Sequence, residues 1–191
     1  MGMTSRFQLA LADHQSALNQ IATLEPELTR LAQACILSLR AGGKILFCGN
    51  GGSSCDADHL AAELVGRFQL NRKGWAAISL ATSTAGLTAI ANDYGFEAVF
   101  ERQVEALGRA RDVLIAISTS GKSPNVLRAA SLAKEMGIHV SAWTGQNPSP
   151  LADLAETKIL APSTVTARIQ EMHILLGHIL CDLIETELTA S

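Results

Sequence analysis

The sequence has little of what marks several broad classes of protein. None of its apolar runs approaches the roughly 20 residues that a membrane-spanning helix requires, so we expect no membrane partner. Neither sign of charge dominates, because 15 Lys and Arg stand against 18 Asp and Glu, for a net charge of −3. That balance gives no reason to expect nucleic acid as a partner.

Cysteine is scarce as well. The four cysteines, at positions 35, 48, 55 and 181, form no C-x-x-C motif, and no secretory signal peptide is recognisable. We therefore expect reduced thiols in a cytoplasmic protein. With 191 residues and no linker, repeat or low-complexity segment, residues 1–191 are expected to form a single domain with a substantial core.

What the sequence does contain is an alternation of short apolar runs with helical patterns. The apolar runs, at residues 44–47, 75–80, 112–117, 139–143 and 156–161, are typical of strands. Helical patterns follow the first loop and then cover residues 84–92, 98–107, 124–136, 149–154 and 164–189. This order predicts a three-layer α-β-α sandwich with a five-stranded parallel sheet, which binds ligands at the carboxyl ends of its strands.

Two further helical patterns precede the first strand, at residues 5–24 and 28–40, with Pro26 between them. The first has too little sheet to cover within its own domain. We therefore expect the segment 1–41 to pack against another subunit, with a helix that folds back on its own domain as the alternative.

The first loop, residues 48–53, is rich in glycine and joins a strand to an alanine-rich helix. Backbone N–H groups in such a turn meet at the positive end of the helix dipole, where they can hold a phosphate. His59 and Glu63 follow at i and i+4, so their side chains share a face near that end. The alternative is an ordinary pair on the helix surface.

A second loop, residues 118–123, also lies between a strand and a helix. Three hydroxyls before Gly121 and one after it can add donors for a phosphate. A Walker loop is excluded because Ala116 stands where that motif needs glycine. Helix capping is the alternative, but four hydroxyls in six residues exceed what a cap needs, so we favour an anion site.

The last helical pattern carries Gln170, His173 and His178 among apolar residues. Gln170 and His178 are eight residues apart, roughly 80° in azimuth and ~12 Å along the axis. One ion between them is possible but stretched. A histidine satisfied by a hydrogen bond in the core is the commoner explanation for either histidine alone, and we interpret His173 as structural or as a support for a neighbouring ligand.

Taken together, these residues resemble the sugar isomerase (SIS) domain family, with its flavodoxin-like sheet, and within it the sedoheptulose 7-phosphate (phosphoheptose) isomerases. The resemblance covers nearly the whole chain. It rests on residues 48–53 with His59 and Glu63, on 66–67, on 92–95, on 117–121, and on 168–173 with His178.

The resemblance implies a homotetramer with active sites at subunit interfaces. It implies an aldose–ketose isomerase that converts sedoheptulose 7-phosphate to D-glycero-D-manno-heptose 7-phosphate through an enediol, in the synthesis of bacterial lipopolysaccharide and other surface glycans. It also implies one Zn²⁺ per subunit, with His59, Glu63, Gln170 and His178 as ligands. The residues implied to bind the sugar phosphate are Asn50, Gly51, Gly52, Ser53, Arg67, Asn92, Asp93, Ser118, Thr119, Ser120, Ser123 and Gln170.

The implied catalytic residues are Glu63 and His178. A carboxylate suits the removal of a carbon-bound proton, and a histidine suits proton shuttling on the oxygens. Glutamate bound to zinc is a poorer base, so either Glu63 leaves the metal during turnover or the ion mainly organises the site.

The sequence departs from the family in ways that leave the sugar open. Ala167 stands where many relatives carry an acidic residue, residues 146–150 lack the usual glycines, and residues 81–86 include one extra position. One alternative is isomerisation of another ketose phosphate. The other is a non-catalytic adaptor like the DnaA initiator-associating protein, which lacks the glutamate found here as Glu63.

Overall fold

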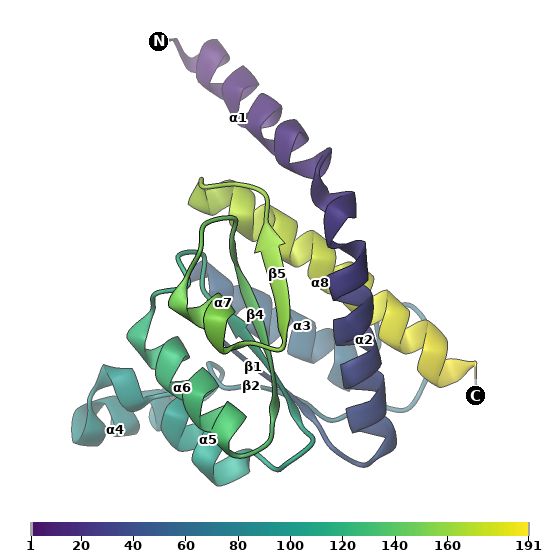
Figure 1. Cartoon of the computed structure of the whole chain (residues 1–191), viewed down its shortest axis with the longest axis vertical. Coiled ribbons are helices and arrows are strands. Elements are labelled where there is room, and N and C mark those ends of the chain that lie inside the picture. The colour runs from purple at the N-terminus through teal and green to yellow at the C-terminus, as the bar shows by residue number, and fades with distance from the viewer. Residues whose placement is uncertain (1, 191) are drawn as a thin grey trace.

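The computed structural model describes residues 2–190 and is built around one five-stranded sheet (Figure 1). All neighbouring strands are parallel, in the order β2-β1-β3-β4-β5. The strands are β1 (Ile45–Gly49), β2 (Ala77–Ser79), β3 (Val113–Ile117), β4 (His139–Gly145) and β5 (Thr157–Ala161). The five predicted strands are confirmed, although β2 is shorter than residues 75–80. Trp75 lies outside it because its N–H donates to the Leu64 carbonyl at 3.0 Å rather than to the sheet.

Helices cover both faces of the sheet, as the alternating pattern predicted. They are α1 (Met3–Leu18), α2 (Glu25–Arg40), α3 (Gly52–Val65), α4 (Thr84–Tyr94), α5 (Glu101–Leu107), α6 (Pro124–Glu135), α7 (Pro150–Leu154) and α8 (Thr166–Thr189). Short 3₁₀ segments are η1 (Ile21–Leu24) and η2 (Phe96–Ala98).

The two faces of the sheet have separate cores because side chains alternate along each strand. Phe47 and its face pack with α2, α3 and α8, whereas Leu46 and the opposite face pack with α5, α6 and α7. All five residues of β3 are buried, which explains its unbroken apolar run. The three-layer α-β-α sandwich is therefore confirmed.

The strand order places the main crevice of the fold. The chain runs from β1 outward to β2 and then returns to the other side of β1 with β3. In such sheets the loops that follow the two central strands diverge to opposite faces and leave a binding crevice at the carboxyl ends. Here those loops lead into α3 and α6, and they are the two loops predicted to bind an anion.

The N-terminal helices differ in detail from the expectation. The helix predicted over residues 5–24 ends at Leu18 and is followed by η1, and Pro26 lies in the first turn of α2, where proline is well tolerated. Much of α1 projects from the domain (Figure 1), with Phe7 66% and Leu11 56% exposed. Its packing against another subunit stays a prediction.

Within residues 2–190, no helix combines the length and apolar character needed to cross a bilayer. All four cysteines are free thiols, and only Cys55 is exposed.

Candidate active site

The site begins where β1 passes into α3. Gly51 has a φ of +55°, a conformation that favours glycine, and it allows the helix to start with only two residues between it and the strand. A side chain at Gly52 would meet the amide of Gln170, since a Cβ there would lie 2.4 Å from Nε2. Two glycines thus let the first turn of α3 approach α8 closely.

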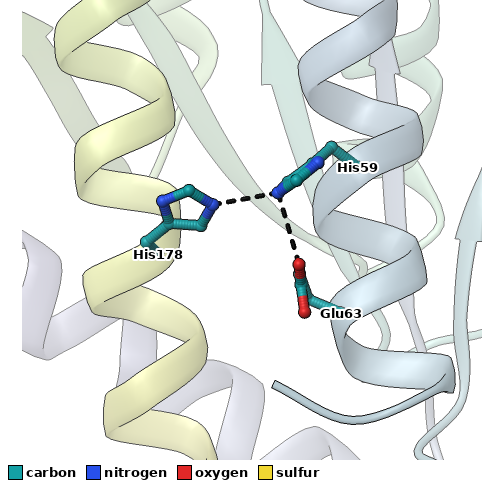
Figure 2. Close-up of side chains that lie close together, drawn as sticks. All are labelled: His59, Glu63 and His178. Carbon is teal, nitrogen blue, oxygen red and sulfur yellow. Dashed lines mark hydrogen bonds and ion pairs between the residues drawn. The ribbon is translucent and has the colours of Figure 1, made fainter. Parts of the chain in front are cut away.

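The two helices remain in contact further along. Gly177 of α8 faces Leu60 of α3, and a Cβ on this glycine would lie 2.6 Å from a Leu60 methyl carbon. The close approach brings His178 from α8 against His59 and Glu63 from α3, as Figure 2 shows. The sequence predicted these three residues on two separate helices. Glu63 and His178 are 115 positions apart in the chain, and the structure brings them together.

The three side chains meet at the His59 imidazole. Its Nε2 lies 2.9 Å from Nε2 of His178 and 3.3 Å from Oε1 of Glu63 (Figure 2). With the protein alone, one imidazole donates this hydrogen bond and the other accepts it. The side chain of His59 is 48% exposed and that of Glu63 is 24% exposed, so the cluster opens to solvent.

This arrangement suits a divalent metal. One ligand atom from each residue lies within 4.8 Å of the other two. Ligands placed tetrahedrally at about 2.0–2.1 Å from Zn²⁺ are roughly 3.3 Å apart, close to the 2.9 and 3.3 Å seen here. Two imidazoles and a carboxylate on an exposed face leave room for a further ligand. His59, Glu63 and His178 therefore form a possible metal-binding triad, whereas a ligand role for Gln170 stays a prediction.

The second loop follows β3 and leads into α6. The Ser118 and Ser123 hydroxyls lie 3.0 Å apart, and Ser120 Oγ accepts from the Lys122 N–H at 3.2 Å. Ser123 is the N-cap residue of α6, yet its side chain makes no cap hydrogen bond. Helix capping therefore does not account for Ser123. Thr119 and Ser120 also line a cleft that reaches Thr166 in the first turn of α8.

Asn125 is a part of the site that the sequence analysis missed. It is 2% exposed, and its amide exchanges two hydrogen bonds of 2.9 Å with the amide of Asn50 in the first loop. Its Oδ1 also accepts from the Val126 N–H at 3.0 Å. A signal was present, because Asn125 falls on the buried stripe of α6 with Ala129 and Ala133.

Two groups on the helices that carry the triad, His173 of α8 and Asp56 of α3, have shifted pKa values. Burial lowers the pKa of His173 to about 4, despite a hydrogen bond from its Nε2 to the Thr144 carbonyl at 3.1 Å. His173 is thus a neutral structural histidine, one of the roles expected for it. Burial raises the pKa of Asp56 to about 6, with the charge of His59 opposing part of that shift, and Asp56 Oδ2 is buried without a hydrogen-bond partner.

Three predicted binding residues lie on exposed segments. Asn92 donates to Asp93 at 2.8 Å, and both are exposed on α4, a helix with no buried residue at the edge of the molecule (Figure 1). Arg67 lies in the loop after α3 and donates to the Gln69 carbonyl at 3.2 Å. Substrate binding by these three residues stays a prediction.

Comparison with known proteins agrees with the fold. Residues 11–145 match the sequence model of the SIS domain. This stretch is more than half of the 191 residues. The chain therefore belongs to the SIS domain family.

Individual relatives are more specific. The chain is 54% identical over 177 residues to a phosphoheptose isomerase from Paramagnetospirillum magneticum, with 92% of each chain covered. It is 51% identical to one from Helicobacter hepaticus, with 91% of this chain and 89% of that protein covered. These relatives confirm the resemblance to the phosphoheptose isomerases that the motifs predicted.

Solved structures agree. The phosphoheptose isomerase GmhA from Neisseria gonorrhoeae superposes with a TM-score of 0.91 at 43% identity, covering 97% of this chain and all of that one. A phosphoheptose isomerase from Francisella tularensis gives a TM-score of 0.94 at 35% identity, with the same coverage.

Proposed function

We propose that this protein is an aldose–ketose isomerase that converts D-sedoheptulose 7-phosphate to D-glycero-D-manno-heptose 7-phosphate, a step toward the heptose of bacterial surface glycans. The observation that carries the proposal is the meeting of His59, Glu63 and His178 beside the glycine-rich loop that opens α3. Relatives named phosphoheptose isomerase at about half identity over most of the chain support the same reaction.

The reaction moves a carbonyl between C1 and C2. A base removes the proton from one carbon, an enediol forms, and a proton returns to the neighbouring carbon. We assign the removal of the carbon-bound proton to Glu63. Its contact with His59 uses Oε1, and a carboxylate has a second oxygen that can take the proton. We assign proton transfer on the substrate oxygens to His178, whose Nε2 faces the same cluster.

We propose Zn²⁺ as the metal, one per subunit, held by His59, Glu63 and His178 with Gln170 as fourth ligand. Nitrogen and oxygen donors of this kind, at spacings near those of a tetrahedral site, support the choice. When bound, the ion would polarise the substrate carbonyl and stabilise negative charge on the enediol oxygens.

We propose that the phosphate binds far from the reacting carbons and fixes the orientation of the sugar. The residues assigned to the sugar phosphate are Asn50, Gly51, Gly52, Ser53, Arg67, Asn92, Asp93, Ser118, Thr119, Ser120, Ser123 and Gln170. The exposed positions of Asn92 and Asp93 on α4, and the apolar residues exposed on α1, support a homotetramer with active sites at its interfaces. The free thiols suit a cytoplasmic location.

The test is an isomerase assay across ketose phosphates of five to seven carbons, with and without a chelator. We expect conversion of sedoheptulose 7-phosphate that chelation reduces. Conversion of a different ketose phosphate alone would change the substrate but keep the reaction. A protein that binds these sugars and converts none would be an adaptor, the role that the contact between Glu63 and His59 argues against.

A further inference from the structure

A buried carboxylate holds the loop that follows α3. Glu185, on α8, is 1% exposed and accepts backbone N–H groups from Phe68 at 3.1 Å, Gln69 at 2.7 Å and Leu70 at 2.8 Å. Its Oε1 also accepts from Arg72 Nε at 2.8 Å. A buried charge is tolerated when it is paired and its lone pairs are satisfied. Glu185 meets that condition and ties residues 68–72 to α8.

Arg72 extends this contact to the helix that carries the triad. Its Nη2 donates to the carbonyl of Glu63 at 2.9 Å, and its Nη1 donates to the carbonyl of Leu64 at 2.9 Å. The last carbonyls of a helix have no partner within the helix, and a cation there also interacts favourably with the helix dipole. The ring of Trp75 covers the guanidinium, with the Arg72 Cζ 3.6 Å from the ring centroid. Arg72 therefore caps α3 at Glu63 itself.

The same loop covers the third member of the triad. The ring of Phe68 stacks on the imidazole of His178, with centroids 5.8 Å apart and planes at 26°. His178 and Glu185 are seven residues apart on α8, which is two helical turns and places them on one face. One end of the loop is thus anchored by Glu185 while its Phe68 ring lies against His178.

We propose that Phe68, Arg72 and Glu185 form a clamp that positions the active site. It fixes the backbone of Glu63 and the imidazole of His178 relative to each other. The inference rests on the proposed roles of that triad. None of the three clamp residues is assigned to the substrate or the metal, so they act as positioning residues. Partners that orient metal ligands commonly change metal affinity or activity by about 10- to 100-fold when they are removed, because a site loosened by about 1 Å loses its function.

Two variants test the clamp without deleting a buried charge. Phe68→Leu keeps an apolar side chain but removes the stacked ring, and Arg72→Lys keeps the charge beside Glu185 but cannot reach the same set of carbonyls. Phe68→Tyr keeps the ring and should restore wild-type behaviour. Leu188→Ala is the matched control, because Leu188 packs on the core one turn beyond Glu185 and takes part in none of the hydrogen bonds or ring contacts that form the clamp.

Three measurements are made on each folded protein. Zn²⁺ affinity is measured by chelator competition, and kcat and KM are measured with sedoheptulose 7-phosphate. The imidazole resonances of His178 are followed by NMR in the metal-free protein. We expect Phe68→Leu and Arg72→Lys to lower Zn²⁺ affinity and kcat by about tenfold, to change KM less than kcat, and to shift or broaden the His178 resonances. The Leu188→Ala protein should be less stable than wild type but should keep the wild-type Zn²⁺ affinity, kinetic constants and His178 resonances.

The clamp would be overturned if both variants kept wild-type Zn²⁺ affinity and Arg72→Lys, which removes no aromatic ring beside His178, kept the wild-type His178 resonances. It would also be overturned if Leu188→Ala changed them equally, since the effect would then be general destabilisation. The NMR measurement needs neither metal nor turnover. A wild-type protein that isomerises no sugar phosphate would therefore refute the proposed function while the clamp was still tested.

Discussion

Asn50 and Asn125 face each other across the central crevice and exchange two amide hydrogen bonds, each 2.9 Å long. Asn50 belongs to the loop after β1, and Asn125 belongs to the first turn of α6, after β3. The pair therefore links the two loops that we assign to the sugar phosphate. It also fixes which edge of the Asn50 amide is left for a ligand.

Asn125→Ala should weaken binding of the sugar phosphate, because it leaves the Asn50 amide without its buried partner. Loss of a buried hydrogen-bond partner costs about 1–3 kcal/mol, so we expect KM to rise by between about 5-fold and about 150-fold, with a smaller change in kcat. Steady-state kinetics measure both. If Asn125 acts through Asn50, then Asn125→Ala should add little to the effect of Asn50→Ala. Fully additive effects in the double variant would mean that the two residues act independently.

His59→Ala should remove the shared member of the metal triad. We expect Zn²⁺ affinity to fall by more than the roughly tenfold that loss of an outer partner costs, as measured by calorimetry with the metal alone. His139→Gln is a suitable control, because this half-buried histidine lies on β4 and pairs with Thr157 at 3.2 Å. Equal Zn²⁺ affinity in His59→Ala and wild type would refute the metal assignment.

His173 should make the free energy of unfolding fall in acid. Its folded-state pKa is about 4, below the ordinary 6.5, so between these values the unfolded chain binds more protons than the folded one. The stabilisation is complete above pH 6.5 and is lost as the pH falls toward 4, at a slope of up to about 1.4 kcal/mol per pH unit. Urea unfolding of the metal-free protein measures it.

The comparison for that measurement is His173→Gln, which cannot titrate. The stability difference between wild type and His173→Gln should shrink as the pH falls. A difference that stays constant from pH 7 to pH 4.5 would contradict the buried, neutral state of His173.

Phe7→Asp combined with Leu11→Asp should disrupt the proposed tetramer. Both side chains are more than half exposed on α1 in the single chain. A charged side chain at these positions costs little free energy if the surface is exposed to water, but it costs much if the surface is buried in an apolar interface. Light scattering should show a smaller particle for this variant and an unchanged one for Gln8→Asp, which replaces an exposed polar residue of the same helix. An unchanged mass in both would place the interface elsewhere.

The sequence predicted best what depends on neighbouring residues. The two strand–loop–helix units and the i, i+4 pair of His59 and Glu63 are local patterns, and the structure contains them. The meeting of this pair with His178 was expected only through the family resemblance. The spacing of residues within α8 does not predict which helix lies beside it. The close approach of Gly177 to Leu60, which brings α8 against α3, depends on how the two helices pack.

Contacts between distant polar residues were not predictable. Asn50 and Asn125 are 75 positions apart, and Arg72 and Glu185 are 113 apart. The sequence gives no sign of either pairing, and only the folded chain shows which residues are partners. The start of β2 was misjudged for a similar reason, because Trp75 is apolar but packs against Arg72 instead of extending the strand.

The most direct test of the account is the conversion of sedoheptulose 7-phosphate in deuterium oxide by wild type and by Glu63→Gln. The wild-type protein should form the aldose phosphate with solvent deuterium at C2. Glu63→Gln should keep its affinity for the sugar phosphate but lose turnover by ~10²-fold or more, since the amide cannot accept the carbon-bound proton. Wild-type turnover and deuterium incorporation in Glu63→Gln would contradict the proposal that this carboxylate moves the proton.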